Sequence, residues 1–111
     1  MKTADLQGAL LDYWVARAEG HTAIILFDEC VVRHGEYHDE MQYSKYAPST
    51  DWAQGGPLIA KHHLNVSETD PPGWVAWSND LDMDYGATPL QAICRAVVRA
   101  AFGDEVEEVL P

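Results

Sequence analysis

Residues 88–103 read TPLQAICRAVVRAAFG, and this stretch carries the clearest structural pattern in the chain. Thr88 is suited to cap a helix, Pro89 fits its first position, and Gly103 is typical of the residue that follows a helix end. Apolar residues recur between these limits at the spacing of one helical face, namely Leu90, Ile93, Cys94, Val97, Val98, Ala101 and Phe102. We therefore predict a helix over residues 89–102. Its opposite face should present a basic ridge to water, formed by Gln91, Arg95 and Arg99.

The N-terminal segment has a second amphipathic pattern. Its buried stripe consists of Leu6, Leu10, Tyr13, Trp14 and Ala18. Thr3 is a suitable cap, Asp5 would complement the helix dipole in the first turn, and Gly20 can end the helix. We predict a helix over about residues 4–18, in which Gly8 costs about 1 kcal/mol relative to Ala.

The residues between these helices favour short strands and a broken helix. Residues 22–33 are rich in β-branched side chains and predict one or two strands, with Asp28 and Glu29 at a turn or on an edge. Residues 34–48 lack periodicity and predict a long connection. Residues 51–64 favour a helix in two pieces, because Gly55-Gly56 interrupts the pattern.

Two further strands are predicted near the C-terminal helix, at Trp74–Ser78 and around Met83–Ala87. Amphipathic helices and short strands can bury their apolar faces together only around a small sheet. The short connections favour antiparallel or mixed pairing. We predict one α+β domain over residues 1–111, in which a small sheet lies beneath or between the helices.

Composition excludes several classes of function. The chain has 111 residues, of which 7 are Lys or Arg and 18 are Asp or Glu, so its formal net charge is −11. A chain with so few basic residues is not expected to bind nucleic acid directly. No apolar run reaches the length of a membrane span, and no secretory leader opens the sequence. Cys30 and Cys94 have apolar neighbours and are expected to be buried thiols of a cytosolic protein.

The run Tyr46-Ala47-Pro48-Ser49-Thr50-Asp51-Trp52-Ala53-Gln54-Gly55-Gly56-Pro57-Leu58-Ile59 resembles the NinX-type family of bacteriophage-borne domains. Thr88-Pro89-Leu90, Gly103-Asp104-Glu105-Val106 and the opening around Leu6, Gly8 and Trp14 are similar to that family as well. A weaker similarity, through residues 88–96, runs to phage α-β-α sandwich proteins, and it implies a sandwich-like arrangement in which helices flank a small antiparallel or mixed sheet. The resemblance implies a phage or prophage protein that acts in the cytoplasm of a bacterial host. It implies no activity, cofactor or catalytic residue.

The segment from Tyr46 to Pro57 is the candidate binding surface. Its residues are Tyr46, Ser49, Thr50, Asp51, Trp52, Gln54, Gly55 and Gly56. Polar and aromatic side chains beside two glycines would let another backbone approach closely. The architectural alternative is that Ser49 or Thr50 caps a turn, Trp52 fills the core, and the glycines adopt positive φ.

No catalytic or metal-binding residues are assigned from the sequence, and no cofactor is expected. Asp80, Asp82 and Asp84 alternate as in a calcium loop, but the required glycine and glutamate are replaced by Tyr85 and Gln91. This favours a solvated strand edge or turn with Leu81 and Met83 turned inward. His34, His38, His62 and His63 lack the spacing of a zinc site and are expected to be surface histidines. No nucleophile motif is present.

Three hypotheses of function follow. The first is a phage accessory protein that binds a host or phage protein without catalysis. The second is a small-molecule or metal-dependent enzyme that uses Asp51 and nearby histidines. The third is an acidic DNA mimic that inhibits a host nucleic-acid-binding protein. Four Trp and five Tyr also exceed what so small a core requires, so an exposed aromatic patch would indicate a homodimer.

Overall fold

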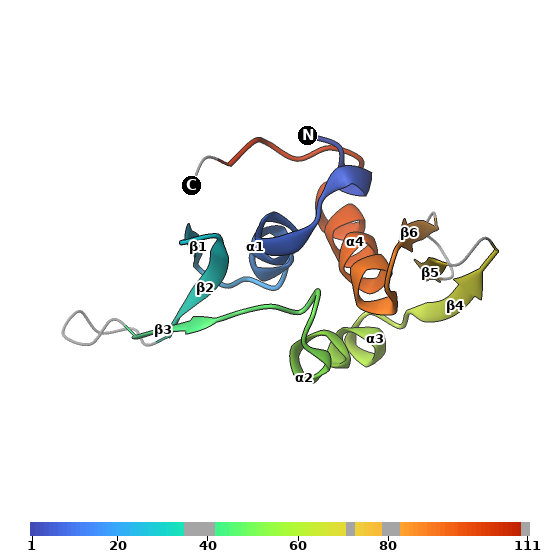
Figure 1. The fold of residues 1–111 in the computed structure, drawn as a ribbon, viewed down its shortest axis with the longest axis horizontal. Coiled ribbons are helices and arrows are strands. Elements are labelled where there is room, and N and C mark those ends of the chain that lie inside the picture. Colours follow the sequence, from blue (N-terminus) through green and yellow to red (C-terminus); the bar gives the residue numbers. More distant parts are fainter. Residues whose placement is uncertain (35–41, 71–72, 79–82, 110–111) are drawn as a thin grey trace.

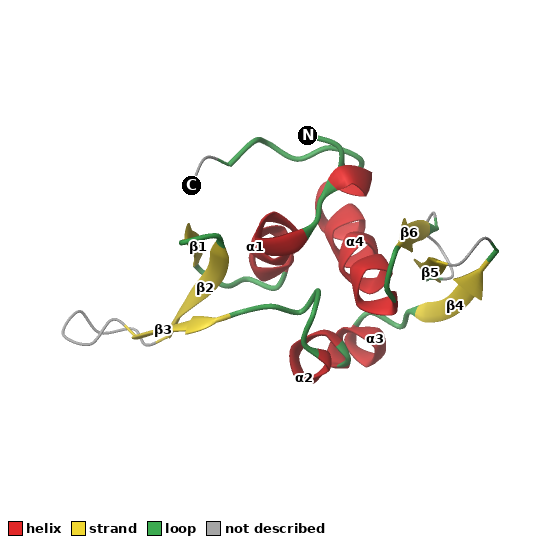
Figure 2. Ribbon diagram, viewed as in Figure 1, coloured by secondary structure: helices red, strands yellow, loops and turns green. Residues whose placement is uncertain are grey.

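The computed structural model describes residues 1–34, 42–70, 73–78 and 83–109 (Figure 1). Within these ranges the chain forms short helices and strands in alternating groups (Figure 2). In chain order the elements are η1 (Thr3–Asp5, a 3-10 turn), α1 (Gly8–Ala18), β1 (Ala23–Leu26), β2 (Glu29–His34), β3 (Gln42–Lys45), α2 (Trp52–Gly55), α3 (Pro57–Lys61), β4 (Asn65–Thr69), β5 (Gly73–Trp77), β6 (Asp84–Gly86) and α4 (Pro89–Phe102).

The strands form two antiparallel sheets, with orders β1-β2-β3 and β4-β5-β6. Helices α1 and α4 pack against each other between the two sheets, as Figure 1 shows. The predicted α+β class and antiparallel pairing are confirmed. The order of the layers differs from the expected sandwich, in which helices flank one sheet. The described strands instead make two sheets, one on each outer side of the pair of helices α1 and α4.

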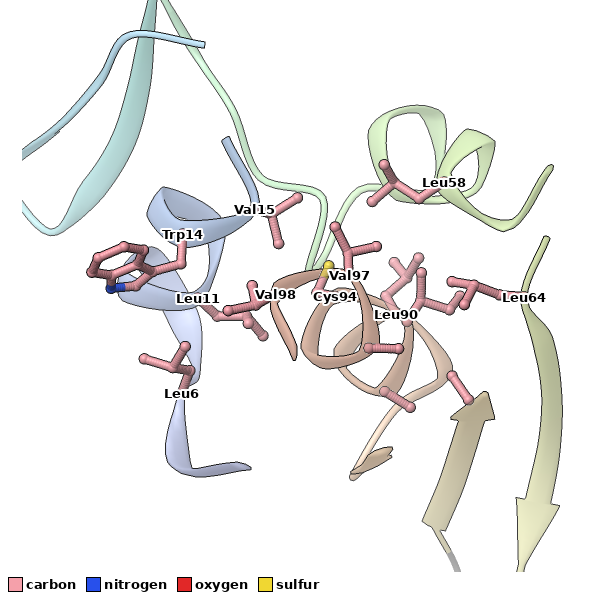
Figure 3. Close-up of a cluster of buried hydrophobic side chains, with 14 of the residues drawn as sticks. Leu6, Leu11, Trp14, Val15, Leu58, Leu64, Leu90, Cys94, Val97 and Val98 are labelled. Atoms are coloured by element: carbon pink, nitrogen blue, oxygen red, sulfur yellow. The ribbon is translucent and has the colours of Figure 1, made fainter. Parts of the chain in front are cut away.

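Helix α4 lies at the centre of the core and has the predicted boundaries. The Gln91 N–H donates to Thr88 Oγ1 at 3.1 Å, which confirms the cap, and Gly103 adopts φ +84°. Figure 3 shows Val98 and Cys94 facing Leu11 and Val15 of α1. Both faces of α4 are covered, so that Ala92 and Ala96 are buried as well. Ala101 and Phe102, predicted to face the core, are exposed at the helix end.

The predicted basic ridge on α4 is wrong. Arg95 is half-buried, and its guanidinium donates to Leu6 O at 2.9 Å and to Tyr85 O at 2.8 Å. Arg99 pairs with Asp84 of β6 and with Asp104 beyond the helix. Both arginines therefore join α4 to neighbouring segments, through the backbone carbonyls of Leu6 and Tyr85 and the carboxylates of Asp84 and Asp104.

The predicted start of the first helix is also wrong. Thr3 caps no helix; its buried hydroxyl donates to Gly103 O at 2.7 Å and ties the N-terminus to the end of α4. The α-helix begins at Gly8, which has φ +60° and so redirects the chain between η1 and α1. Gly8 is therefore not a helix-interior glycine, and the expected stability cost does not arise. Leu6 is buried, but it precedes the helix.

Residues 22–33 form a β-hairpin, and Phe27 and Asp28 make its two-residue connection with φ +49° and +63°. The expected long connection over residues 34–48 contains strand β3, which pairs with β2. The predicted strands near residues 74–78 and 83–87 correspond to β5 and β6, whereas β4 was not predicted. Of the helices described, none is long and apolar enough to cross a membrane.

Candidate functional site

Asp51 organises the candidate segment by capping the short helix α2. Its Oδ1 accepts a hydrogen bond of 2.9 Å from the Ala53 N–H. The two expected caps are wrong. The Ser49 N–H instead donates to Oδ1 of Asp12 on α1 at 2.8 Å, and Thr50 is exposed. Asp12 therefore fixes the turn that leads into α2.

Gln54 fastens the segment to the end of β3. Its Oε1 accepts from the Ala47 N–H at 2.6 Å, and its Nε2 donates to Lys45 O at 3.1 Å. Both bonds close a loop between residues 45 and 54. A short helix that has few bonds of its own is thereby held in one orientation.

Gly55 and Gly56 are needed for close packing and not for an unusual backbone conformation. Gly56 has φ −55°, and Gly55 is absent from the positive-φ positions, so the expectation of positive φ is wrong. A Cβ at Gly55 would lie 2.3 Å from Pro48 O and 2.7 Å from Leu90 Cδ2. Gly55 thus lets the candidate segment contact α4 directly.

Trp52 is the exposed aromatic residue of the segment, with 54% of its surface accessible. The alternative in which it fills the core is therefore wrong. Trp52 is the first residue of α2 and directly follows Asp51, which caps this helix. Its backbone is held by the contacts of Asp51, Gln54 and Gly55, so the ring is presented on a fixed support.

A cavity of about 210 Å³ lies beside the segment, between the start of α1, the β1–β2 hairpin and residues 45–50. Its polar lining includes Asp12, Ser49 and Thr50, with Asp28, Glu29 and Lys45 around them. Asp12 is buried, and this burial raises the pKa of its carboxyl, while the hydrogen bond from Ser49 acts in the opposite direction. The candidate residues Ser49 and Thr50 therefore line this cavity, whereas Trp52 lies outside its lining.

Tyr46 joins the cavity to the core. It is half-buried, its ring makes an edge contact with His21 at 5.4 Å between centroids, and burial raises the pKa of its phenol.

Lys45 and Glu29, at the rim of the cavity lining, form an ion pair of 3.2 Å that joins β3 to β2.

The structure describes the side chains of His62, His63 and Asp84 among the histidines and aspartates considered for metal binding. Within the described ranges, no group of three His, Cys, Asp or Glu residues is placed to hold a metal ion. His62 Nε2 lies 3.0 Å from Glu19, which also pairs with Lys61, and His63 is exposed. Asp80, Asp82, His38 and the expected inward Leu81 fall outside the described residues, as does the side chain of His34.

The predicted orientation of Met83 and Asp84 is wrong. Met83 is 52% exposed, while Asp84 is buried and bound to Arg99. The exposed carboxylates are spread over several parts of the fold. They lie in the β1–β2 turn, at the cap before α2, on β4 and in the segment after α4, namely Asp28, Asp51, Glu68 and Glu107.

Comparison with known protein families matches residues 2–100 to the family described as Bacteriophage P22, NinX. The chain belongs to the NinX family. The match spans the whole candidate segment, α1, and α4 as far as residue 100, so the resemblance to this family seen in the sequence is confirmed. No curated protein matches this NinX family member.

Asp12 is the site residue that sequence reasoning missed in this NinX family chain. A carboxylate beside the apolar Leu11 and Trp14 was the available signal. Burial of such a group requires a hydrogen-bond partner, and Ser49 provides it.

Proposed function

We propose that this phage-encoded NinX family protein acts without catalysis, as a module that binds a host or phage protein through the surface around Trp52. The exposure of Trp52 on a rigid support carries the proposal. Tryptophan is enriched among the residues that dominate binding energy at protein interfaces. An indole held in place before binding also loses little conformational entropy when the partner docks.

The neighbouring groups suit a polar rim around this anchor. Thr50 and Asp51 are exposed beside Trp52 and offer a hydroxyl and a carboxylate. Interfaces commonly surround a buried aromatic anchor with polar groups of this kind. Asp51 already accepts the Ala53 N–H, which favours a positioning role over general base catalysis.

The test compares binding by the wild-type protein with binding by Trp52→Ala in pull-downs from host lysate, with and without phage infection. Tyr85→Ala is the matched control, because Tyr85 is likewise an exposed aromatic residue, at 57%, and lies on β6 of the β4-β5-β6 sheet. We expect a stoichiometric partner with the wild type and the control, and its loss with Trp52→Ala. The melting temperature of Trp52→Ala should stay within a few degrees of wild type.

A partner that Trp52→Ala captures as well as the wild type does would contradict the assignment of this surface. Repeating the capture at low and high salt separates apolar docking from charge attraction. An indole-centred contact should survive high salt, whereas binding through carboxylates should weaken steeply.

A further inference from the structure

The cavity of about 210 Å³ beside residues 45–50 has a buried carboxyl in its lining. Asp12 of α1 belongs to this lining, and only 5% of its surface is exposed. Its Oδ1 accepts the Ser49 N–H at 2.8 Å, and within the described residues its Oδ2 accepts no backbone hydrogen bond. A carboxylate removed from water is costly unless hydrogen-bond donors surround it. Asp12 therefore has room for a further donor on Oδ2.

Two hydroxyl groups belong to the same lining. Ser49 is 8% exposed, and its Oγ is buried near the Asp12 carboxyl without a hydrogen-bond partner of normal geometry in the part of the chain that the structure describes. Thr50 is exposed and lines the cavity as well. A buried polar atom that the folded chain leaves without a partner indicates that a water or a ligand supplies one. Together with Oδ2 of Asp12, the two hydroxyl oxygens offer three acceptors.

The charge of the lining favours a cation. Asp12, Asp28 and Glu29 are acidic, whereas Lys45 is the single basic residue among the lining residues. Lys45 Nζ is held by Glu29 at 3.2 Å. The N-terminus of α1 also borders the cavity, but its partial charge of about +0.5 is smaller than the excess of carboxylates. A positively charged group is therefore attracted to this cavity.

An alkylammonium group fits these acceptors better than a metal ion or a guanidinium group. No three His, Cys, Asp or Glu side chains in the described ranges are placed to hold a metal ion. A guanidinium group prefers a carboxylate with both oxygens free for two parallel bonds, and Oδ1 of Asp12 is already engaged by Ser49. An ammonium group carries three donors on one atom and needs only one carboxylate oxygen beside neutral acceptors. Small apolar side chains in the lining can contact an alkyl chain, namely Ala9, Cys30 and Ala47.

We propose that this cavity binds a primary ammonium group on an alkyl chain, with Oδ2 of Asp12 and the hydroxyl oxygens of Ser49 and Thr50 as its acceptors. The volume of about 210 Å³ is smaller than the roughly 300–1,000 Å³ of sites for drug-sized ligands. It suits one small aliphatic amine or one lysine side chain. Trp52 is not in the lining, so this site is separate from the contact proposed for the indole.

Titration of the full chain with n-butylammonium chloride tests the site, followed through the backbone amide NMR signals of Ser49 and Thr50 at constant ionic strength. We expect saturable shifts with a dissociation constant of about 1 to 10 mM, because a ligand of so few atoms gains little binding energy. The n-butyltrimethylammonium ion has the same charge but no N–H donor, and it should bind at least about tenfold more weakly. The absence of saturable shifts up to about 100 mM, or equal binding of the two cations, would overturn the proposal.

Three variants test the acceptors and separate this site from the indole surface. Asp12→Asn removes the charge and keeps an oxygen for the Ser49 N–H, so it should raise the dissociation constant by at least about tenfold without unfolding the chain. Ser49→Ala removes the hydroxyl that lacks a partner within the described residues, so it should weaken binding and shift the melting temperature by only a few degrees. Trp52→Ala should bind the amine like the wild type, whatever its effect on a protein partner.

Glu68→Gln is the control for Asp12→Asn, because it removes the same charge at an exposed position on β4. It should bind n-butylammonium like the wild type. Equal affinity of Asp12→Asn and the wild type, or equal weakening by Glu68→Gln, would show that the amine is held by the general charge of the protein and not by this cavity.

The source of the ammonium group is tested with Nα-acetyl-lysine methylamide, which has the same charge as n-butylammonium. If it binds at least as tightly, the cavity accepts a lysine side chain of another protein. If its amide groups prevent entry while n-butylammonium still binds, the ligand is a free aliphatic amine. Both results support the ammonium site and identify its occupant.

Discussion

Arg99 Nε on α4 donates a hydrogen bond of 2.7 Å to Oδ1 of Asp84 on β6, and only 2% of the Asp84 side chain is exposed. This ion pair fixes the second sheet to the central helix. The same guanidinium contacts Asp104, whose side chain is 80% exposed. One arginine thus holds both a buried and a solvated carboxylate.

The two carboxylates should differ in their contribution to stability. Asp84→Ala leaves the half-buried guanidinium without its buried partner and should lower the free energy of unfolding by about 3 kcal/mol. Asp104→Ala removes a solvated partner and should cost less than about 1 kcal/mol. Urea denaturation of both variants measures the difference. Equal losses would mean that the Asp84 pair contributes no more than a surface ion pair.

Asp12 should make stability depend on pH. Burial raises the pKa of its carboxyl in the folded state, so the folded chain holds this proton more tightly than the unfolded chain does. The contribution that this proton makes to the stability of the folded state is therefore lost as pH rises from about 4, the ordinary pKa, through the raised value.

Asp12→Asn removes this titration while its amide oxygen can still accept the Ser49 N–H. The variant should gain stability relative to wild type as pH rises from 4 to 7. Chemical denaturation at several pH values, with both proteins in the same buffers, gives the difference directly. A difference that does not change with pH would show that Asp12 titrates as it does in the unfolded chain.

Gly55→Ala should destabilise the protein, because the added Cβ would meet Pro48 O and the Leu90 side chain well inside contact distance. We expect a loss of about 2 kcal/mol in the free energy of unfolding, from overpacking between α2 and α4. Gly20→Asn is the control: Gly20 has φ +84° and open space around it, and Asn tolerates that conformation. Thermal denaturation should show a large shift for the first variant and a small one for the second.

Local signals explain why α4 was predicted with its boundaries. The cap Thr88, the apolar spacing and Gly103 all lie within one short stretch. The start of the first helix has no such set of local signals. Thr3 has the chemistry of a cap, yet its hydroxyl binds Gly103, a residue 100 positions away. No pattern near Thr3 contains that contact.

The candidate segment also depends on contacts between residues that are distant in the sequence. Ser49, Thr50 and Asp51 can all cap a helix, and the sequence does not choose between them. Asp12 on α1 takes the Ser49 N–H, and Asp51 is left to cap α2. The exposure of Trp52 follows from that geometry, since it depends on which way the short helix faces. The place of Phe27 in the hairpin turn was not predicted for a related reason, because this turn is defined only by the pairing of β1 with β2.

The two cysteines should be unreactive in the folded protein. Burial raises the pKa of Cys30 to about 12 and that of Cys94 further, and the charge of Asp12 adds to both shifts. Each unit of pKa lowers the reactive thiolate fraction at neutral pH about tenfold. Labelling with Ellman's reagent at pH 8 should therefore be at least about a hundredfold slower in native buffer than in guanidinium chloride. Rapid labelling of either thiol in native buffer would show that β2 or α4 opens readily, since both cysteines are buried in the folded protein.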